Sequence, residues 1–214
     1  MTVTHFPSDA TLAAFASGAL DEGRSLVVAT HLALCPESRA RVRAYEHIGG
    51  ELLNRNTPTP MAADALANTL ARLDAPESAS ERGLPPRGDN DIRLPAPLDA
   101  YDLGSWQWIG RGVRLRTVSG LDDQASRVFM LCAEPGTRLP HHRHTGAEWT
   151  CVFQGAFTHA HGRYGTGDFD EADETVEHHP TVEAGEACIC LVALQGQIQF
   201  QGWFGRLLQP FVRI

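Results

Sequence analysis

The chain has 214 residues with 18 basic and 26 acidic side chains, a net charge of −8. Phosphate neutralisation needs a basic surface, so this charge argues against direct binding of DNA. No apolar run approaches the roughly 18 residues of a membrane span, and the first ten residues lack the features of a signal peptide. We therefore expect a cytoplasmic protein without membrane contact. Five cysteines, an odd number, favour thiols or metal ligands over a disulfide framework.

Residues 1–74 predict four short helices with a core that is marginal alone. Ser8 or Asp9 can cap the first helix, the second should end near Cys35, and Pro36 suits the first turn of the third. The fourth follows the proline-rich run at 57–60. The apolar positions recur at helical spacing and are Leu12, Phe15, Ala16, Ala19, then Leu26, Val27, Leu34, then Val42, Tyr45, Ile48, Leu52, Leu53, then Leu66, Leu70, Leu73.

The amino-acid composition changes twice along the rest of the chain. Residues 75–95 are rich in Pro, Gly, Ser and charge, which predicts a flexible linker. From residue 96, short apolar or alternating runs separated by turn residues predict strands. Many short strands without helical periodicity favour an antiparallel barrel or sandwich. The sequence thus predicts an α+β protein in two domains, with four helices over 1–74 and an antiparallel β-barrel of the jelly-roll kind over 96–214.

Most of the ten histidines fall between residues 141 and 179, and some follow a regular spacing. Five residues separate Gly136 from His142, one lies between His142 and His144, three precede Glu148, and six precede Gly155. Two histidines two apart on a strand point to the same face. Two imidazoles and a carboxylate that converge inside a barrel provide three ligands for a metal. This spacing resembles the first motif of the cupin barrels; the alternative is a group of surface histidines in a polar loop.

A second cupin motif normally supplies one more histidine, and here the match is only approximate. An acidic insertion follows Gly167 and separates it from His178 and His179. On an extended strand these two neighbours point to opposite faces, so only one of them can join the metal ligands. The other histidines of this half are expected at the surface or lining a pocket, and they are His141, His159 and His161.

The cupin motif, the acidic stretch, Glu177-His178-x-Pro180 and the run from Cys188 to Leu191 together resemble the C-terminal domain of the ChrR anti-sigma factors. Members of that family restrain a group IV ECF sigma factor of the RpoE type. The resemblance implies a cupin-like domain with one zinc ion. It implies the four zinc ligands His142, His144, Glu148 and His178.

The resemblance extends to the first 74 residues, where the family carries a second zinc with the pattern His, about 25 residues, His-x3-Cys-x2-Cys. This chain has His5, twenty-five intervening residues, His31 and Cys35, but Ser38 stands where the last cysteine belongs. The resemblance implies a weakened zinc site at His5, His31 and Cys35, because a serine hydroxyl is a much poorer zinc ligand than a thiolate. The alternative is that Cys35 is a buried apolar thiol and His31 an ordinary residue on the helix surface.

The function that the resemblance implies is sequestration of the sigma factor, with release on singlet oxygen or organic hydroperoxide. The helical domain would bind the sigma factor through apolar helix faces, and the cupin domain would contribute to sensing. Cys188 and Cys190 point to one face of a strand, either as participants in that chemistry or as two core thiols. We expect a regulatory protein that is not an enzyme.

Two other functions remain open at this point. Cupins with three histidines and a glutamate also hold iron, nickel or manganese and catalyse dioxygenase or isomerase reactions. A cupin metalloenzyme of the dioxygenase kind with an appended helical domain is therefore one alternative. A metal-binding sensor that has lost its sigma partner is the other, and Ser38 makes it plausible.

Overall fold

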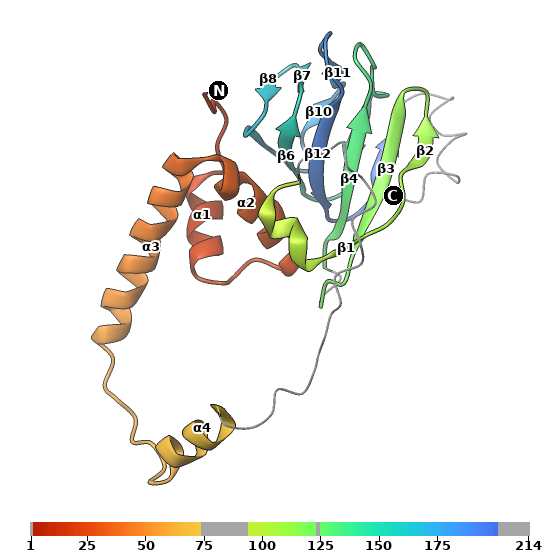
Figure 1. Ribbon diagram of the computed structural model, residues 1–214. Coiled ribbons are helices and arrows are strands. Elements are labelled where there is room, and N and C mark those ends of the chain that lie inside the picture. The colour runs from red at the N-terminus through yellow and green to blue at the C-terminus, as the bar shows by residue number, and fades with distance from the viewer. Residues whose placement is uncertain (1, 74–93, 123–124, 201–214) are drawn as a thin grey trace.

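The computed structural model describes residues 2–73, 94–122 and 125–200, and its helices precede its strands (Figure 1). Residues 75–93 of the predicted linker, and the predicted β-domain beyond residue 200, lie outside this part of the chain. The helices are α1 (Asp9–Ala16), α2 (Glu22–Leu34), α3 (Pro36–Asn54) and α4 (Ala65–Leu73), with a 3-10 turn η1 (Ala96–Ala100) before the strands. The four predicted helices are confirmed.

Local sequence signals set the ends of the first three helices. The Ser8 side chain accepts a hydrogen bond from the amide of Thr11 at the start of α1. Asp21 does the same for Arg24 at the start of α2. Cys35 ends α2 and caps α3, whose first residue is proline. These side chains satisfy backbone amides that have no partner within the helix, so each helix begins where its cap stands.

In the described part of the chain, thirteen short strands form antiparallel sheets. The largest sheet runs β1-β3-β4-β12-β6-β9 with β2 beside β3, and two three-stranded sheets run β10-β5-β13 and β11-β7-β8. The predicted α+β class is confirmed, although the described strands form three sheets and no closed barrel. The strand bounds are β1 Asp102–Leu103, β2 Gln107–Gly110, β3 Val113–Ser119, β4 Arg127–Ala133, β5 His142–His144, β6 Glu148–Gln154, β7 Ala156–His159, β8 Gly162–Gly165, β9 Phe169–Ala172, β10 Glu177–His178, β11 Thr181–Val182, β12 Cys188–Leu194 and β13 Ile198–Phe200.

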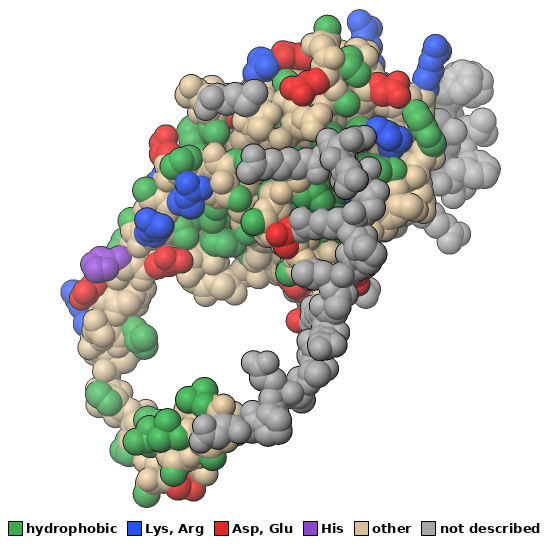
Figure 2. All heavy atoms as spheres, in the orientation of Figure 1, with side chains coloured by type: hydrophobic (Ala, Val, Ile, Leu, Met, Phe, Trp, Pro, Cys, Tyr) green, Lys and Arg blue, Asp and Glu red, His purple; other side chains and the backbone are tan. Residues whose placement is uncertain are grey.

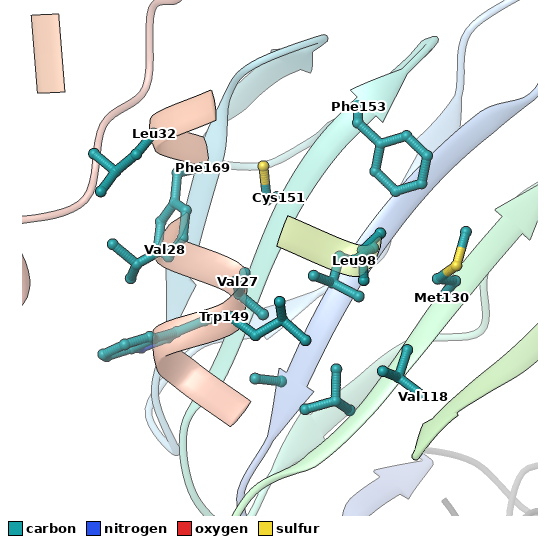
Figure 3. Packing of buried hydrophobic residues seen from close by; sticks show 14 of the residues in the cluster. Val27, Val28, Leu32, Leu98, Val118, Met130, Trp149, Cys151, Phe153 and Phe169 are labelled. Carbon is teal, nitrogen blue, oxygen red and sulfur yellow. The ribbon is translucent and has the colours of Figure 1, made fainter. Parts of the chain in front are cut away.

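Helices α1 to α3 and the large sheet share one hydrophobic core (Figure 3). Val27 and Val28 of α2 are fully buried against the sheet, where they join Trp149 and Phe169. A helical unit too small to bury its own apolar residues has covered them with the outer face of the sheet.

Strand β12 is buried on both faces, which explains its continuous apolar sequence. Ile189, Leu191 and Ala193 face the helices and belong to the shared core. Cys190 and Val192 belong to a second cluster on the inner face of the sheet. Because side chains alternate along a strand, β12 connects the interior of the β domain with the helical unit.

Gly23 allows α2 to approach the sheet closely. A Cβ atom at this position would lie 2.8 Å from a methyl carbon of Val128 and 2.9 Å from the Cβ of Ser126. Real Cβ atoms do not come this near to other carbon atoms, so only glycine permits the observed distance between α2 and β4.

Hydrogen bonds also join the N-terminal segment to the loop before β9. The Asp168 carboxylate accepts from the backbone amides of Thr4 at 2.6 Å, His5 at 2.9 Å and Gly165 at 2.8 Å. The amide of Phe169 donates to the carbonyl of His5 at 3.1 Å. Residues 4 and 5 are therefore held against the β domain before the first helix begins.

The end of α3 and all of α4 remain outside the shared core. None of the residues of α4 is buried, and Figure 1 shows this helix standing apart from the sheets. Figure 2 shows apolar side chains gathered over α4. The exposed large apolar residues of this region are Ile48, Leu52, Leu53, Met61, Leu66, Leu70 and Leu73.

Candidate metal centre

Three histidines and a glutamate meet on the inner side of the β domain. His142 and His144 lie on β5 with their side chains on the same buried face, while Arg143 between them is exposed. His178 on β10 pairs directly across from His142, and Glu148 begins β6. One ligand atom from each of the four residues lies within 4.8 Å of the others. The structure thus brings together the four residues named from the sequence.

The histidine rings present the nitrogens that a metal needs. Nε2 of His178 lies 2.9 Å from Nε2 of His142 and 3.2 Å from Nε2 of His144. Nδ1 of His142 lies 2.7 Å from the carbonyl oxygen of Pro140, so this nitrogen donates and Nε2 of the neutral ring carries the lone pair that can bind a metal. The buried Nδ1 atoms of His144 and His178 have no hydrogen-bond partner among the described residues, so hydrogen bonds within the cluster leave ring nitrogens unsatisfied. The donor set therefore fits a cation at its centre.

Burial controls the charge of this group. It lowers the pKa of His144 to about 4 and that of His178 to about 3, with neighbouring imidazoles adding to both shifts. Burial, followed by the negative charge of Asp170, raises the pKa of Glu148 to about 8. Without a cation the group therefore favours neutral imidazoles and a protonated carboxyl. A divalent cation would replace that proton, because metal ligands bind in their deprotonated forms.

A second pair of polar residues borders the cluster. His159 is fully buried at its side chain, and its Nε2 lies 3.1 Å from a carboxylate oxygen of Asp170. Although burial favours the neutral acid, this hydrogen bond helps hold the pKa of Asp170 below its ordinary value. His159, Asp170 and His178 form a second group whose ligand atoms lie within 4.8 Å of one another.

Asp170 was missed by the sequence analysis because its acidic stretch reads as an insertion. The alternation of β9 is the signal that could have found it: Phe169 faces the helices, so its neighbour faces the interior. The structure agrees only in part with the expectation for the remaining histidines. His178 is buried and His179 exposed, as strand alternation predicts, and His141 and His161 are also exposed.

An apolar cavity of about 370 Å³ adjoins the four-residue group. His142, Glu148 and His178 form part of its wall, and most of the remainder is aliphatic or aromatic. Cys188 and Cys190 also line it, with their sulfur atoms 3.9 Å apart. The cavity therefore gives a small apolar molecule a place beside both the ligand nitrogens and the two thiols.

The N-terminal residues named from the sequence are only partly brought together. His31 and Cys35 both lie within hydrogen-bonding reach of Ser38, with Nε2 of His31 2.8 Å and Sγ of Cys35 3.4 Å from its hydroxyl oxygen. His5 instead stacks on Tyr164 of the β domain, with ring centroids 4.2 Å apart. Among the described residues, His5, His31 and Cys35 do not gather their ligand atoms as the cupin residues do.

Comparison with known proteins agrees with this architecture. The sequence model of the ChrR cupin-like domain matches residues 100–198. A Cereibacter sphaeroides protein named anti-sigma-E factor ChrR is 40% identical over 219 residues, which cover 100% of each chain. The chain belongs to the ChrR family of anti-sigma factors. The resemblance seen in the sequence is confirmed.

A solved structure supports the same assignment for both halves of the molecule. The crystal structure of Rhodobacter sphaeroides SigE in complex with the anti-sigma ChrR matches 91% of this chain and 100% of that chain. The TM-score is 0.75 and the identity 37%. The ChrR-like arrangement therefore includes the helices as well as the cupin domain. No helix in the described ranges is both long enough and apolar enough to cross a membrane.

Proposed function

We propose that this chain sequesters a group IV ECF sigma factor in the cytoplasm, holds one zinc ion in its cupin domain, and releases the sigma factor on an oxidative signal. The role is regulatory, without catalytic turnover. Membership of the ChrR family supports the class of partner. The observation that carries the proposal is the large apolar surface of α3 and α4, which covers no other part of the described chain.

The apolar residues of this surface lie in helical stripes. Leu66, Leu70 and Leu73 share one face of α4, and Ile48 and Leu52 share one face of α3. The exposed fractions of these five side chains lie between 51% and 76%. Contiguous exposed apolar residues of this kind mark an interaction surface, and helix faces with this spacing bind apolar grooves.

The metal part of the proposal depends on the donor set. Three neutral imidazoles and one carboxylate, supplied by His142, His144, His178 and Glu148, suit zinc or a related divalent ion. When bound, zinc would act as a Lewis acid and fix the relative positions of β5, β6 and β10. The carbonyl of Pro140 keeps His142 in the tautomer that binds metal.

The release part depends on access to that group. The apolar cavity reaches three of the four ligands, His142, Glu148 and His178, and the Cys188–Cys190 pair, so an oxidant or hydroperoxide that enters it meets oxidisable sulfur and metal ligands together. Strand β12 carries both cysteines and packs against α2 on its other face. A change at the cysteines can therefore act on the helical unit through one strand.

The partner is tested by co-expression and co-purification with the ECF sigma factor that accompanies this protein in its own genome. Leu70→Asp places a charge in the apolar stripe, and we expect it to abolish capture. Ala71→Asp is the matched control, because it adds the same charge at the next residue on the opposite face of α4. Equal capture by both variants would refute the role of this surface.

The metal is tested by zinc content. Wild-type chain purified without chelator should contain one zinc ion, and the double change His142→Ala/His144→Ala should remove it. Full zinc content in the double variant would refute the assignment. A screen for dioxygenase and isomerase turnover with the zinc and iron forms separates the regulator from a cupin enzyme.

A further inference from the structure

His31, Cys35 and Ser38 form a complete hydrogen-bonded network at the position where the family pattern places an N-terminal zinc. We infer that this chain has replaced that zinc with a metal-free clasp, defined as His31, Cys35, Ser38 and the carbonyl of Gly167. The clasp fastens the helical unit to the β domain. It carries no metal in the functional protein, so the chain binds a single zinc ion, in its cupin half.

The hydrogen-bond directions in the clasp follow from chemistry alone. A carbonyl oxygen only accepts, so Nδ1 of His31, 2.8 Å from the Gly167 oxygen, must donate. Burial lowers the pKa of His31 to about 4, and the ring is therefore neutral near pH 7. Its Nε2 must then accept, and the Ser38 hydroxyl at 2.8 Å supplies the proton.

The remaining groups complete the chain of donors. The Ser38 oxygen accepts from the Cys35 thiol at 3.4 Å, and the Cys35 sulfur accepts from the Ser38 amide, also at 3.4 Å. His31 and Ser38 are both 0% exposed, and Cys35 is 1% exposed. Every polar atom of these side chains has a partner, so the site offers no unsatisfied group that would call for a cation.

The fourth member of the family pattern points elsewhere. His5 and Phe6 are neighbours in the segment that is held against the loop before β9, so their side chains point in different directions. Phe6 meets the edge of His31 at a centroid distance of 6.4 Å, whereas His5 stacks on Tyr164. The backbone of His5 is held by Asp168 and Phe169, which fixes this choice.

A zinc ion at this position would therefore have too few ligands. His31 and Cys35 remain within reach, and the Ser38 hydroxyl is not deprotonated near neutral pH. Structural zinc sites use four strong ligands. Binding would also require loss of the thiol proton and of the hydrogen bond between Ser38 and His31. The intact clasp instead leaves the attachment of α2 and α3 to the β domain independent of zinc supply.

The test isolates the N-terminal position by removing the cupin ligands. The full chain with His142→Ala/His144→Ala is expressed with added zinc, and its zinc content is measured by mass spectrometry. We expect zero zinc per chain and a melting temperature that does not change with EDTA. Retention of one zinc per chain, or a melting temperature lowered by EDTA, would overturn the inference.

A second variant guards against misfolding of the double variant. Cys35→Ala in the otherwise wild-type chain should leave the zinc content unchanged, and loss of one ion per chain would overturn the inference. The cupin proposal fails separately, because it predicts one zinc in the wild type and none in the double variant. A wild type that contains no zinc would refute the cupin site and leave the clasp standing.

Discussion

Ser38→Ala is the most direct perturbation of the clasp. The change deletes one buried hydroxyl and leaves Nε2 of His31 without its donor at 2.8 Å and the Cys35 thiol without its acceptor. A buried polar atom left without a partner costs about 1–3 kcal/mol, and the thiol, a weak donor, adds little. We therefore expect the free energy of unfolding to fall by about 2 kcal/mol. For a chain of this size that corresponds to a melting temperature lower by roughly 4–8 °C.

The measurement is thermal and urea unfolding of the full chain in EDTA, so that no bound metal contributes. Ser17→Ala is the matched control, because it deletes the same atom from an exposed serine whose hydroxyl donates to the carbonyl of Ala14. The control should change the free energy of unfolding by less than about 0.5 kcal/mol. If Ser38→Ala is as mild as Ser17→Ala in EDTA, the hydrogen bonds of the clasp do not stabilise the fold and the reasoning is wrong.

Three further predictions concern the same region and its packing. Ser38→Cys adds a thiol beside Cys35 and a histidine already in the ligand tautomer, but His5 stays stacked on Tyr164, so zinc content should rise by less than one ion per chain. Unchanged zinc content would contradict this. Gly23→Ala should destabilise the fold by about 1–3 kcal/mol, because the new Cβ would lie 2.8 Å from a side chain of β4. In the control Gly49→Ala the new Cβ meets nothing within 4 Å, and this change should stabilise the fold by about 0.5–1 kcal/mol. Burial lowers the pKa of His31 from 6.5 to about 4. Between these two pH values the unfolded chain therefore binds a proton at His31 and the folded chain does not. Protonation of His31 alone should therefore leave the free energy of unfolding undiminished above pH 6.5 and lower it by up to about 3 kcal/mol as the pH drops to 4, a contribution that His31→Gln should remove from the acid titration.

Local features could be predicted because their causes are local. Ser8 marks a helix start through a hydrogen bond within one turn and Pro36 through its fixed backbone angle, and the structure places both at the predicted positions. The spacing of His142 and His144 needs only the two-residue period of a strand. The spacing alone does not predict that His178 joins these two histidines. The resemblance to ChrR implied it, and His178 pairs across the strands with His142.

Features that depend on distant segments could not be predicted. The burial of α2 is set by β6 and β12, more than a hundred residues away, so its apolar faces did not reveal the shared core. His5 fits the spacing of a zinc ligand, yet hydrogen bonds from its backbone to Asp168 and Phe169 turn its ring onto the β domain. Asp170 lies beside the metal ligands because β9 pairs with β6, and the alternation of β9 alone shows only that its side chain faces inward.

The shared core also affects how the chain folds during its synthesis. During synthesis α2 leaves the ribosome long before the strands that bury it, since about 160 residues separate Val28 from Ile189 on β12. At bacterial elongation rates of about 5–20 residues per second, the side of α2 that later faces the sheet stays exposed to solvent for roughly 8–32 seconds. Over that interval the nascent helices present two apolar surfaces, the one destined for the sheet and the one on α3 and α4. Translation speed through the last strands, and the presence of a chaperone or the partner itself near the ribosome, should therefore control the yield of folded protein.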